Sequence, residues 1–245
     1  MAVLEHVSTG SPAPGRVNLL APEVVADPYG FFASHREKDP IFWNESLQAW
    51  VVTSYDLVRG CFRDPALSAD RITPYYRSRL TGPDAELHRP NYEMMSRWMV
   101  FVDAPEHTRL RRLIDRAFRP RAVERLVPEV EGMVEGLLDQ VQGRDSWDFL
   151  ADFAFPLPVL VICRMFGVPQ EDTGLIKGWS DDILTLVFGA LDVADRHVRA
   201  RRAFLELSDY LGVLIEERRK NPGEDLISML LGKQQGESLS DQEII

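Results

Sequence analysis

The stretch Phe101-Val-Asp-Ala-Pro-Glu-His-Thr-Arg-Leu-Arg-Arg-Leu113 is the most informative part of the chain. Asp103 is a favourable helix N-cap, Pro105 suits a first helical turn, and Glu106 follows Asp103 by three residues, as in a capping box. Apolar residues then recur at helical spacing. They are Leu110, Leu113, Ile114, Ala117 and Phe118. The pattern predicts an amphipathic helix that begins near residue 103.

Two basic side chains of this predicted helix are spaced to bind one anion. His107 and Arg111 lie four residues apart, so they face the same side of the helix and are able to hold a single anionic group together. The alternative is a solvated helix face on which Arg111 pairs with Asp115. Such an exposed pair contributes only a few tenths of a kcal/mol, roughly.

Composition indicates a globular protein. The 245 residues are 45% hydrophobic and 27% charged, which is ordinary for a folded domain. The longest apolar runs are too short to cross a bilayer. Residues 1–10 lack a basic start and an apolar core, so we expect no signal peptide and a cytoplasmic location. The two cysteines, Cys61 and Cys163, form neither a disulfide framework nor a zinc motif.

Charge is distributed unevenly along the chain. A net charge of −10 argues against nucleic-acid binding. Residues 107–125 nevertheless hold seven arginines against Asp115 and Glu124: Arg109, Arg111, Arg112, Arg116, Arg119, Arg121 and Arg125. This local excess predicts a docking face for an acidic partner, with a solvated helix face as the alternative.

The rest of the chain reads as many helices and one small sheet. A helix is predicted over 28–38, a β-hairpin over 41–53 and a helix over 55–62. The Pro- and Tyr-rich segment 67–102 is predicted to be irregular, forming a pocket wall or lid. Further helices are expected over 120–141, around Leu160, and over 171–188, 192–220 and 225–231.

The last residues carry a helix start. Ser240-Asp-Gln-Glu243 is a capping box followed by Ile244-Ile245. A helix needs roughly a dozen residues to be stable alone. The pattern leads us to expect that the chain is the front part of a longer protein.

Together these motifs resemble the N-terminal half of a bacterial cytochrome P450, over almost the whole chain. The most specific is Asp103-Ala-Pro-Glu-His-Thr-Arg-Leu-Arg-Arg-Leu113. It occurs in order with several weaker motifs. These are Ala26-Asp-Pro-Tyr-Gly-Phe-Phe32, Phe62-Arg-Asp-Pro-Ala-Leu-Ser-Ala-Asp70, Asp152-Phe-Ala-Phe-Pro-Leu-Pro158 and Ile162-Cys-Arg-Met-Phe-Gly-Val-Pro169.

The resemblance implies a mainly α fold with a small β-sheet, residues 1–245 forming part of a single domain cut at the start of its central helix. It implies a haem whose propionates contact His107 and Arg111. It also implies a distal pocket lined by Tyr75, Tyr76 and Leu80 and a lid region with Leu184, Val187 and Phe188. Arg109, Arg112 and Arg116 would face a ferredoxin or flavodoxin-type electron donor.

The sequence also departs from the family pattern. It contains neither an Ala-Gly-x-x-Thr stretch for oxygen activation nor the family's cysteine loop, which supplies the axial thiolate to the haem iron. We therefore expect the N-terminal part of a monooxygenase that inserts one oxygen atom from O2 into a small hydrophobic substrate, inactive by itself. The alternatives are a haem-less auxiliary protein that supports a partner enzyme and a generic helical adaptor.

Overall fold

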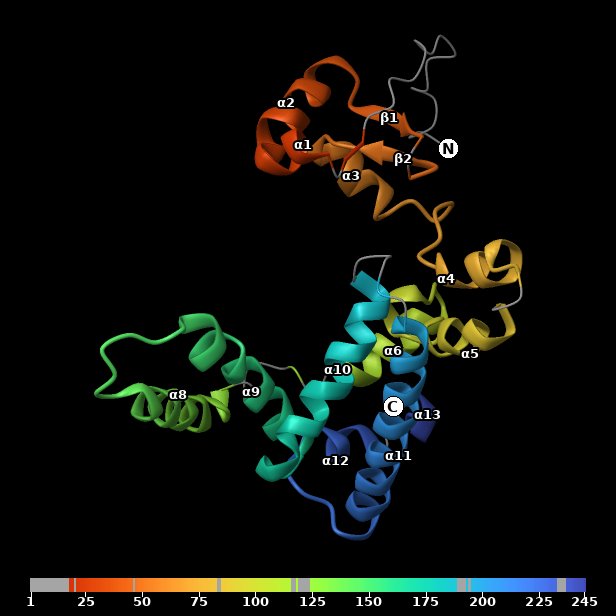
Figure 1. The fold of residues 1–245 in the computed structure, drawn as a ribbon. Helices are drawn as coiled ribbons and strands as arrows, with labels where there is room; N and C mark the ends of the chain where they lie inside the picture. Colours follow the sequence, from red (N-terminus) through yellow and green to blue (C-terminus); the bar gives the residue numbers. More distant parts are fainter. Residues whose placement is uncertain are drawn as a thin grey trace. The chain divides into compact units, whose positions relative to one another are not determined.

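The computed structural model describes residues 18–19, 21–45, 47–82, 85–115, 118, 124–188, 193, 195–232 and 237–245 (Figure 1). The chain divides into two compact units, residues 1–68 and 69–245. Each is described by itself. The assignment of both to one domain stays a prediction.

The first unit contains a hairpin and three short helices. Its elements are α1 (Pro22–Ala26), α2 (Pro28–Lys38), β1 (Ile41–Asn44), β2 (Ala49–Val52) and α3 (Tyr55–Cys61). The Asp27 carboxylate accepts a hydrogen bond from the backbone N–H of Gly30 at 2.9 Å, which caps α2. The two strands pair antiparallel, and Trp43 lies opposite Trp50. The predicted hairpin and its flanking helices are confirmed.

The elements assigned among the described residues of the second unit are all helices. Its elements are α4 (Ile72–Pro74), η2 (Tyr75–Arg79), α5 (Ala85–Met95), η3 (Met99–Phe101), α6 (Glu106–Asp115), α8 (Val127–Val141), η5 (Leu150–Ala154), α9 (Pro156–Phe166), η6 (Gln170–Asp172), α10 (Thr173–Phe188), α11 (Arg196–Lys220), α12 (Leu226–Leu231) and α13 (Asp241–Ile244). The fold class, mainly α with a small sheet, is confirmed. None of the described helices is both long enough and apolar enough to span a membrane.

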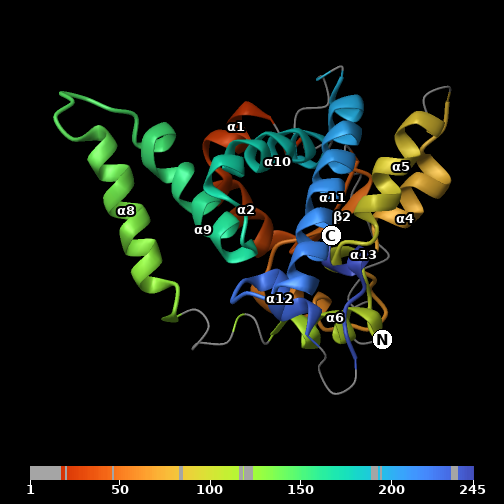
Figure 2. The same ribbon diagram turned by 90° about the horizontal axis from the view of Figure 1, so that it is seen from below.

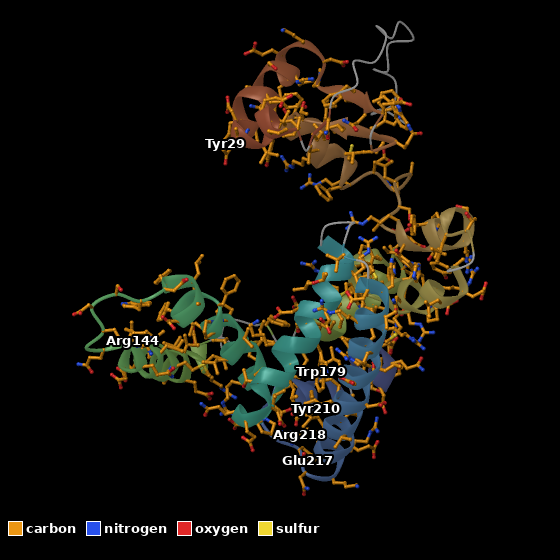
Figure 3. All side chains as sticks on the ribbon, in the orientation of Figure 1. Tyr29, Arg144, Trp179, Tyr210, Glu217 and Arg218 are labelled. Atoms are coloured by element: carbon orange, nitrogen blue, oxygen red, sulfur yellow. The ribbon has the colours of Figure 1, made fainter. Side chains whose placement is uncertain are left out.

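The longest helix, α11, is the centre of this unit. It runs beside α10, and it contacts α5 and α12 at different points along its length (Figures 1 and 2). The indole of Trp179 donates to Glu206 at 2.6 Å, and the hydroxyl of Tyr210 donates to Asp172 at 2.7 Å. Trp179 and Tyr210 therefore cross-link α11 to α10 and to the η6 turn before it (Figure 3).

The apolar stripe of α11 forms much of the core. Phe204, Leu211 and Leu214 are buried as the sequence predicts. Phe204 packs with Met95 of α5 and Ile183 of α10. Leu211 and Leu214 pack with Cys163 of α9. Burial raises the pKa of the Cys163 thiol, so this cysteine remains a neutral, small apolar side chain.

One core residue of α11 allows a direct test of this packing. Ile215 is 0% exposed. We expect Ile215→Ala to lower the free energy of unfolding by about 2–5 kcal/mol, since the surrounding helices cannot close fully around the cavity. Val213 on the same helix is 69% exposed, and Val213→Ala should change stability by about 0.5 kcal/mol or less. Urea unfolding followed by circular dichroism measures both, and equal losses would contradict this packing.

The prediction that residues 67–102 are irregular is wrong. Most of this segment is helical, and α5 continues through Pro90 in its interior. An interior proline removes a helix hydrogen bond and normally breaks a helix. Here tertiary packing outweighs that cost, because Asn91 and Met95 of α5 are 0% and 3% exposed.

The remaining sequence predictions hold with small shifts of boundary. The capping box at Ser240 is present, with the Ser240 backbone N–H donating to the Glu243 carboxylate at 2.7 Å. The helix predicted from Pro120 begins at Val127, and residues 119–123 lie outside the described residues. The helices predicted from 171, 192 and 225 begin at Thr173, Arg196 and Leu226.

Candidate functional site

Helix α6 is anchored by one apolar face. Leu110 and Leu113 are 6% and 3% exposed, and they pack against Leu226 and Leu230 of α12 and against Leu239. The start of the helix is also held in place. The backbone N–H of His107 donates to the carbonyl of Asp103, and the Asp103 carboxylate accepts from the backbone N–H of Ala69 at 2.7 Å. These contacts fix where the polar side chains of α6 lie.

His107 and Arg111 lie next to this apolar face on successive turns. His107 is half-buried and Arg111 is exposed. Among the described residues, neither side chain makes a hydrogen bond or an ion pair, and Arg111 does not pair with Asp115. The alternative that Arg111 is an ordinary i,i+4 ion-pair partner is therefore not realised. Two cationic or hydrogen-bonding side chains one turn apart form a donor set for an anion.

Arg109 and Arg112 differ from Arg111, because both are already engaged within the chain. Arg109 pairs with Glu106 at 2.6 Å and with Glu243 of α13. Arg112 pairs with Glu237 at 2.5 Å. These ion pairs connect α6 to the last described segment of the chain.

The ion pairs of Arg109 change the acidity of its partners. The hydrogen bond from Arg109 lowers the pKa of the Glu106 carboxyl. Burial alone would raise the pKa of Glu243. Hydrogen bonds from the backbone and hydroxyl of Ser240 and from Arg109 outweigh that effect, and the pKa is lowered. Both carboxylates stay charged near neutral pH and neutralise Arg109.

The residues predicted to meet a substrate come from two segments that the fold brings together. Val187 of α10 packs on the same buried cluster as Tyr92 and Met95 of α5. Tyr75 is 41% exposed with its ring 5.1 Å from that of Tyr92, whereas Tyr76 is 8% exposed. Leu80 is half-buried and Leu184 is 48% exposed. Phe188 ends α10, and its side chain lies outside the described residues, as does Arg116.

A cavity of about 620 Å³ lies elsewhere, among residues of α8, α9 and α12. Two of its three arginines are engaged, because Arg164 pairs with Glu129 and Arg218 pairs with Asp225 at 2.6 Å. It includes neither His107 nor Arg111. We therefore do not place the candidate site in this cavity.

The sequence did not point to several polar contacts that the structure contains. Asp182 of α10 is 8% exposed and accepts from Arg199 at 2.9 Å. The rings of His88 and His197 stack with their centroids 3.6 Å apart. The partners are 17 and 109 residues apart, so no local spacing indicates either contact.

Known proteins with similar sequences and structures share one family. No family model matches the chain. Cytochrome P450 CYP107DY1 of Priestia megaterium is 32% identical over 92% of this chain and 56% of its own length. Cytochrome P450 monooxygenase PikC of Streptomyces venezuelae is 34% identical over 97% and 55%.

The solved structures agree. The complex of P450BioI with an acyl carrier protein ligated to hexadec-9Z-enoic acid has a TM-score of 0.76 and 29% identity. It covers 90% of this chain and 55% of its own. The Bacillus subtilis cytochrome P450 PksS has a TM-score of 0.72 and 30% identity, over 91% and 53%. This chain belongs to the bacterial cytochrome P450 family. It spans about half the length of the curated relatives it matches.

Cytochromes P450 bind haem through an axial cysteine in their C-terminal half. The donor set on α6 fits the periphery of such a haem, because propionates are anions and His107 and Arg111 are unpaired donors within the described structure. Neither cysteine of this chain fits the axial role. Cys61 lies in α3 of the first unit, and Cys163 is buried with a raised thiol pKa.

Proposed function

We propose that this chain forms the part of a cytochrome P450 monooxygenase that holds the haem propionates and one side of a hydrophobic substrate pocket. The whole enzyme inserts one oxygen atom from O2 into a small hydrophobic organic substrate. The observation that carries the proposal is the contrast on α6. Arg109 and Arg112 are engaged in ion pairs, whereas Arg111 and His107 have no partner among the described residues.

The chain's own residues hold and orient the cofactor. Arg111 donates to a propionate through its guanidinium, and His107 adds a hydrogen bond from its ring. The apolar contacts of Leu110 and Leu113 keep both donors on one side of the helix, one turn apart. When bound with its axial thiolate, haem supplies the activation of oxygen.

Substrate contacts are proposed from the two segments that meet beside α11. Tyr75 and Leu184 are the most exposed of these residues, and Leu80, Val187 and Phe188 line the same region in this proposal. Tyr76 is buried, so it supports the wall rather than touching substrate directly. The apolar character of the set favours a hydrophobic substrate.

A redox partner is proposed at the basic surface of α6. The side chains of Arg109 and Arg112 remain 29% and 47% exposed despite their ion pairs. In this proposal an acidic ferredoxin or flavodoxin-type donor pairs with Arg116 and competes with Glu106, Glu243 and Glu237 for Arg109 and Arg112. A cytoplasmic location is part of the same proposal.

The experiment that tests this function supplies the missing thiolate. This chain is fused to the C-terminal half of PikC, purified, loaded with haem, reduced and exposed to carbon monoxide. We expect the red-shifted absorption band of a thiolate-ligated haem. A folded fusion that stays colourless would contradict the proposal and favour the haem-less auxiliary alternative.

A further inference from the structure

The contact between α5 and α11 is built around two histidines. The rings of His88 on α5 and His197 on α11 stack with their centroids 3.6 Å apart and their planes 12° apart. One turn further along α5, the amide nitrogen of Asn91 donates to the backbone carbonyl of His197 at 2.9 Å. Asn91 is 0% exposed. The two helices run side by side at this point (Figures 1 and 2).

Two buried polar atoms at this contact have no partner. Within the described structure, Nδ1 of His197 and Oδ1 of Asn91 are buried and make no hydrogen bond. An uncharged imidazole tolerates an unpaired ring nitrogen at moderate cost. An imidazolium in the same place would carry a buried positive charge with a donor that lacks an acceptor, which costs far more.

The groups around His197 do not compensate such a charge. On α11, the Nε of Arg196 lies 3.5 Å from Nε2 of His197, and Arg201 contacts the sulfur of Met94 at 3.7 Å. From α5 the facing groups are His88 and Tyr92, the latter with its ring centroid 6.0 Å from that of His197.

The neighbouring elements add no acidic partner. From η2, Tyr75 hydrogen-bonds to Tyr92, and burial together with Tyr75 raises the pKa of Tyr92 to about 12, so the Tyr92 phenol stays neutral. Glu86 of α5 pairs with Arg89, and Asp182 of α10 pairs with Arg199 and Arg202. Glu86 and Asp182 therefore pair with arginines and not with His197.

We propose that the stack of His88 on His197 forms a pH-sensitive latch, which holds α5 against α11 while the buried side of the His197 ring is uncharged and releases α5 when His197 gains a proton. The proposal does not depend on haem or on the proposed function. It concerns a contact that this chain makes by itself.

The direction of the pH dependence follows from His197. Burial, and then the electrostatic effects of His88 and Arg196, lower the pKa of His197 from 6.5 to about 4. When α5 separates, the ring regains its ordinary pKa and binds a proton more readily. The open form therefore binds more protons between about pH 6.5 and pH 4. The latch is fully effective above that range and weakens as pH falls through it.

Release of α5 would change the region in which substrate contacts are proposed. α5 carries Tyr92 and Met95, which pack against Ile183 and Phe204 of the α10–α11 pair. Opening the latch exposes this cluster and frees Tyr75 from its contact with Tyr92. The access of solvent to this cluster should therefore increase in mild acid.

The test is hydrogen exchange on the purified chain at pH 7.5 and pH 5.0, with rates corrected for intrinsic exchange. We expect protection of the α5 amides to fall by about tenfold at the lower pH, the full shift being reduced because the ring is partly exposed. Amides of α12, which lacks titratable histidines, should change much less.

Variants separate the latch from general acid sensitivity. His197→Gln should make α5 protection nearly independent of pH, whereas His88→Gln should keep part of the pH response, because burial is the largest cause of the lowered pKa of His197. His35→Gln, in the first unit, should leave the wild-type response intact. Asn91→Ala should lower protection at both pH values but keep the pH dependence. Equal α5 protection at the two pH values in the wild type would overturn the proposal. So would an unchanged pH response in the His197 variant.

Discussion

Replacing Asp225 with alanine is expected to lower the free energy of unfolding by about 3–5 kcal/mol, because it leaves the largely buried Arg218 with only the exposed Glu217 as a counter-charge. The side chains of Arg218 and Asp225 are only 15% and 8% exposed. Arg218 Nε donates to the Asp225 carboxylate at 2.6 Å, and Arg218 Nη2 donates to the carbonyl of Gly167 at 2.9 Å. The same carboxylate accepts from the backbone N–H of Ser228 at 2.8 Å and caps α12.

Asp225 thus joins the end of α9, the end of α11 and the start of α12 (Figure 3 labels Arg218). Asp225→Asn separates its two roles. The amide oxygen can still cap α12 but no longer neutralises Arg218, so we expect an intermediate loss.

The matched control is Asp241→Ala, which removes a carboxylate that pairs with Arg219 at the surface, where the side chains are 41% and 44% exposed. An exposed pair of this kind contributes about 1 kcal/mol or less. Urea unfolding of the variants gives the comparison. Losses of similar size for Asp225→Ala and Asp241→Ala would contradict a buried structural role for Asp225.

The double substitution His107→Ala with Arg111→Ala is expected to weaken haem binding by the fused protein at least about a hundredfold. A hydrogen bond to a charged group contributes about 1.5–3 kcal/mol, so Arg111→Ala alone should weaken binding about tenfold to a hundredfold. Haem transfer to apomyoglobin measures the loss. Unchanged haem retention in both variants would exclude these residues as propionate ligands.

Arg112→Ala is the control on the same helix. Its guanidinium pairs with Glu237 at 2.5 Å, so its removal should alter haem affinity by about threefold or less, well under one charged hydrogen bond. If Arg112→Ala weakened haem binding as much as Arg111→Ala, a general loss of positive charge on α6 would explain both results.

Local patterns in the sequence predicted the elements that local interactions determine. The apolar spacing of Leu110 and Leu113 predicts α6 and its buried face. The i,i+4 spacing of His107 and Arg111 places both on one side of that helix. The hairpin at Trp43 and Trp50 and the capping box at Ser240 follow from the same kind of short-range pattern.

Contacts between distant residues decide what the sequence did not show. Pro90 predicts a break in a helix, yet α5 persists because Asn91 and Met95 are buried against elements that lie far away in the sequence. The stack of His88 on His197 likewise joins residues that no local motif connects.

The same reason explains why the long-range ion pairs of Arg109 and Arg112 could not be predicted. The sequence alone does not show which basic side chains of α6 are paired within the chain. Arg109 and Arg112 are distinguished only because Glu243 and Glu237 lie more than 120 residues later and fold back onto them. Arg111 differs from these two arginines because no described side chain pairs with it.

In the proposed function, His107 and Arg111 recognise the charged propionates of haem. The most direct measurement compares the affinity of the apo fused protein for haem and for haem dimethyl ester, whose propionates are uncharged. We expect that the wild type binds haem at least about tenfold more tightly than the ester, and that the His107→Ala, Arg111→Ala variant loses this preference. Equal affinity of the wild type for the two porphyrins, or a preference that survives in the double variant, would contradict it.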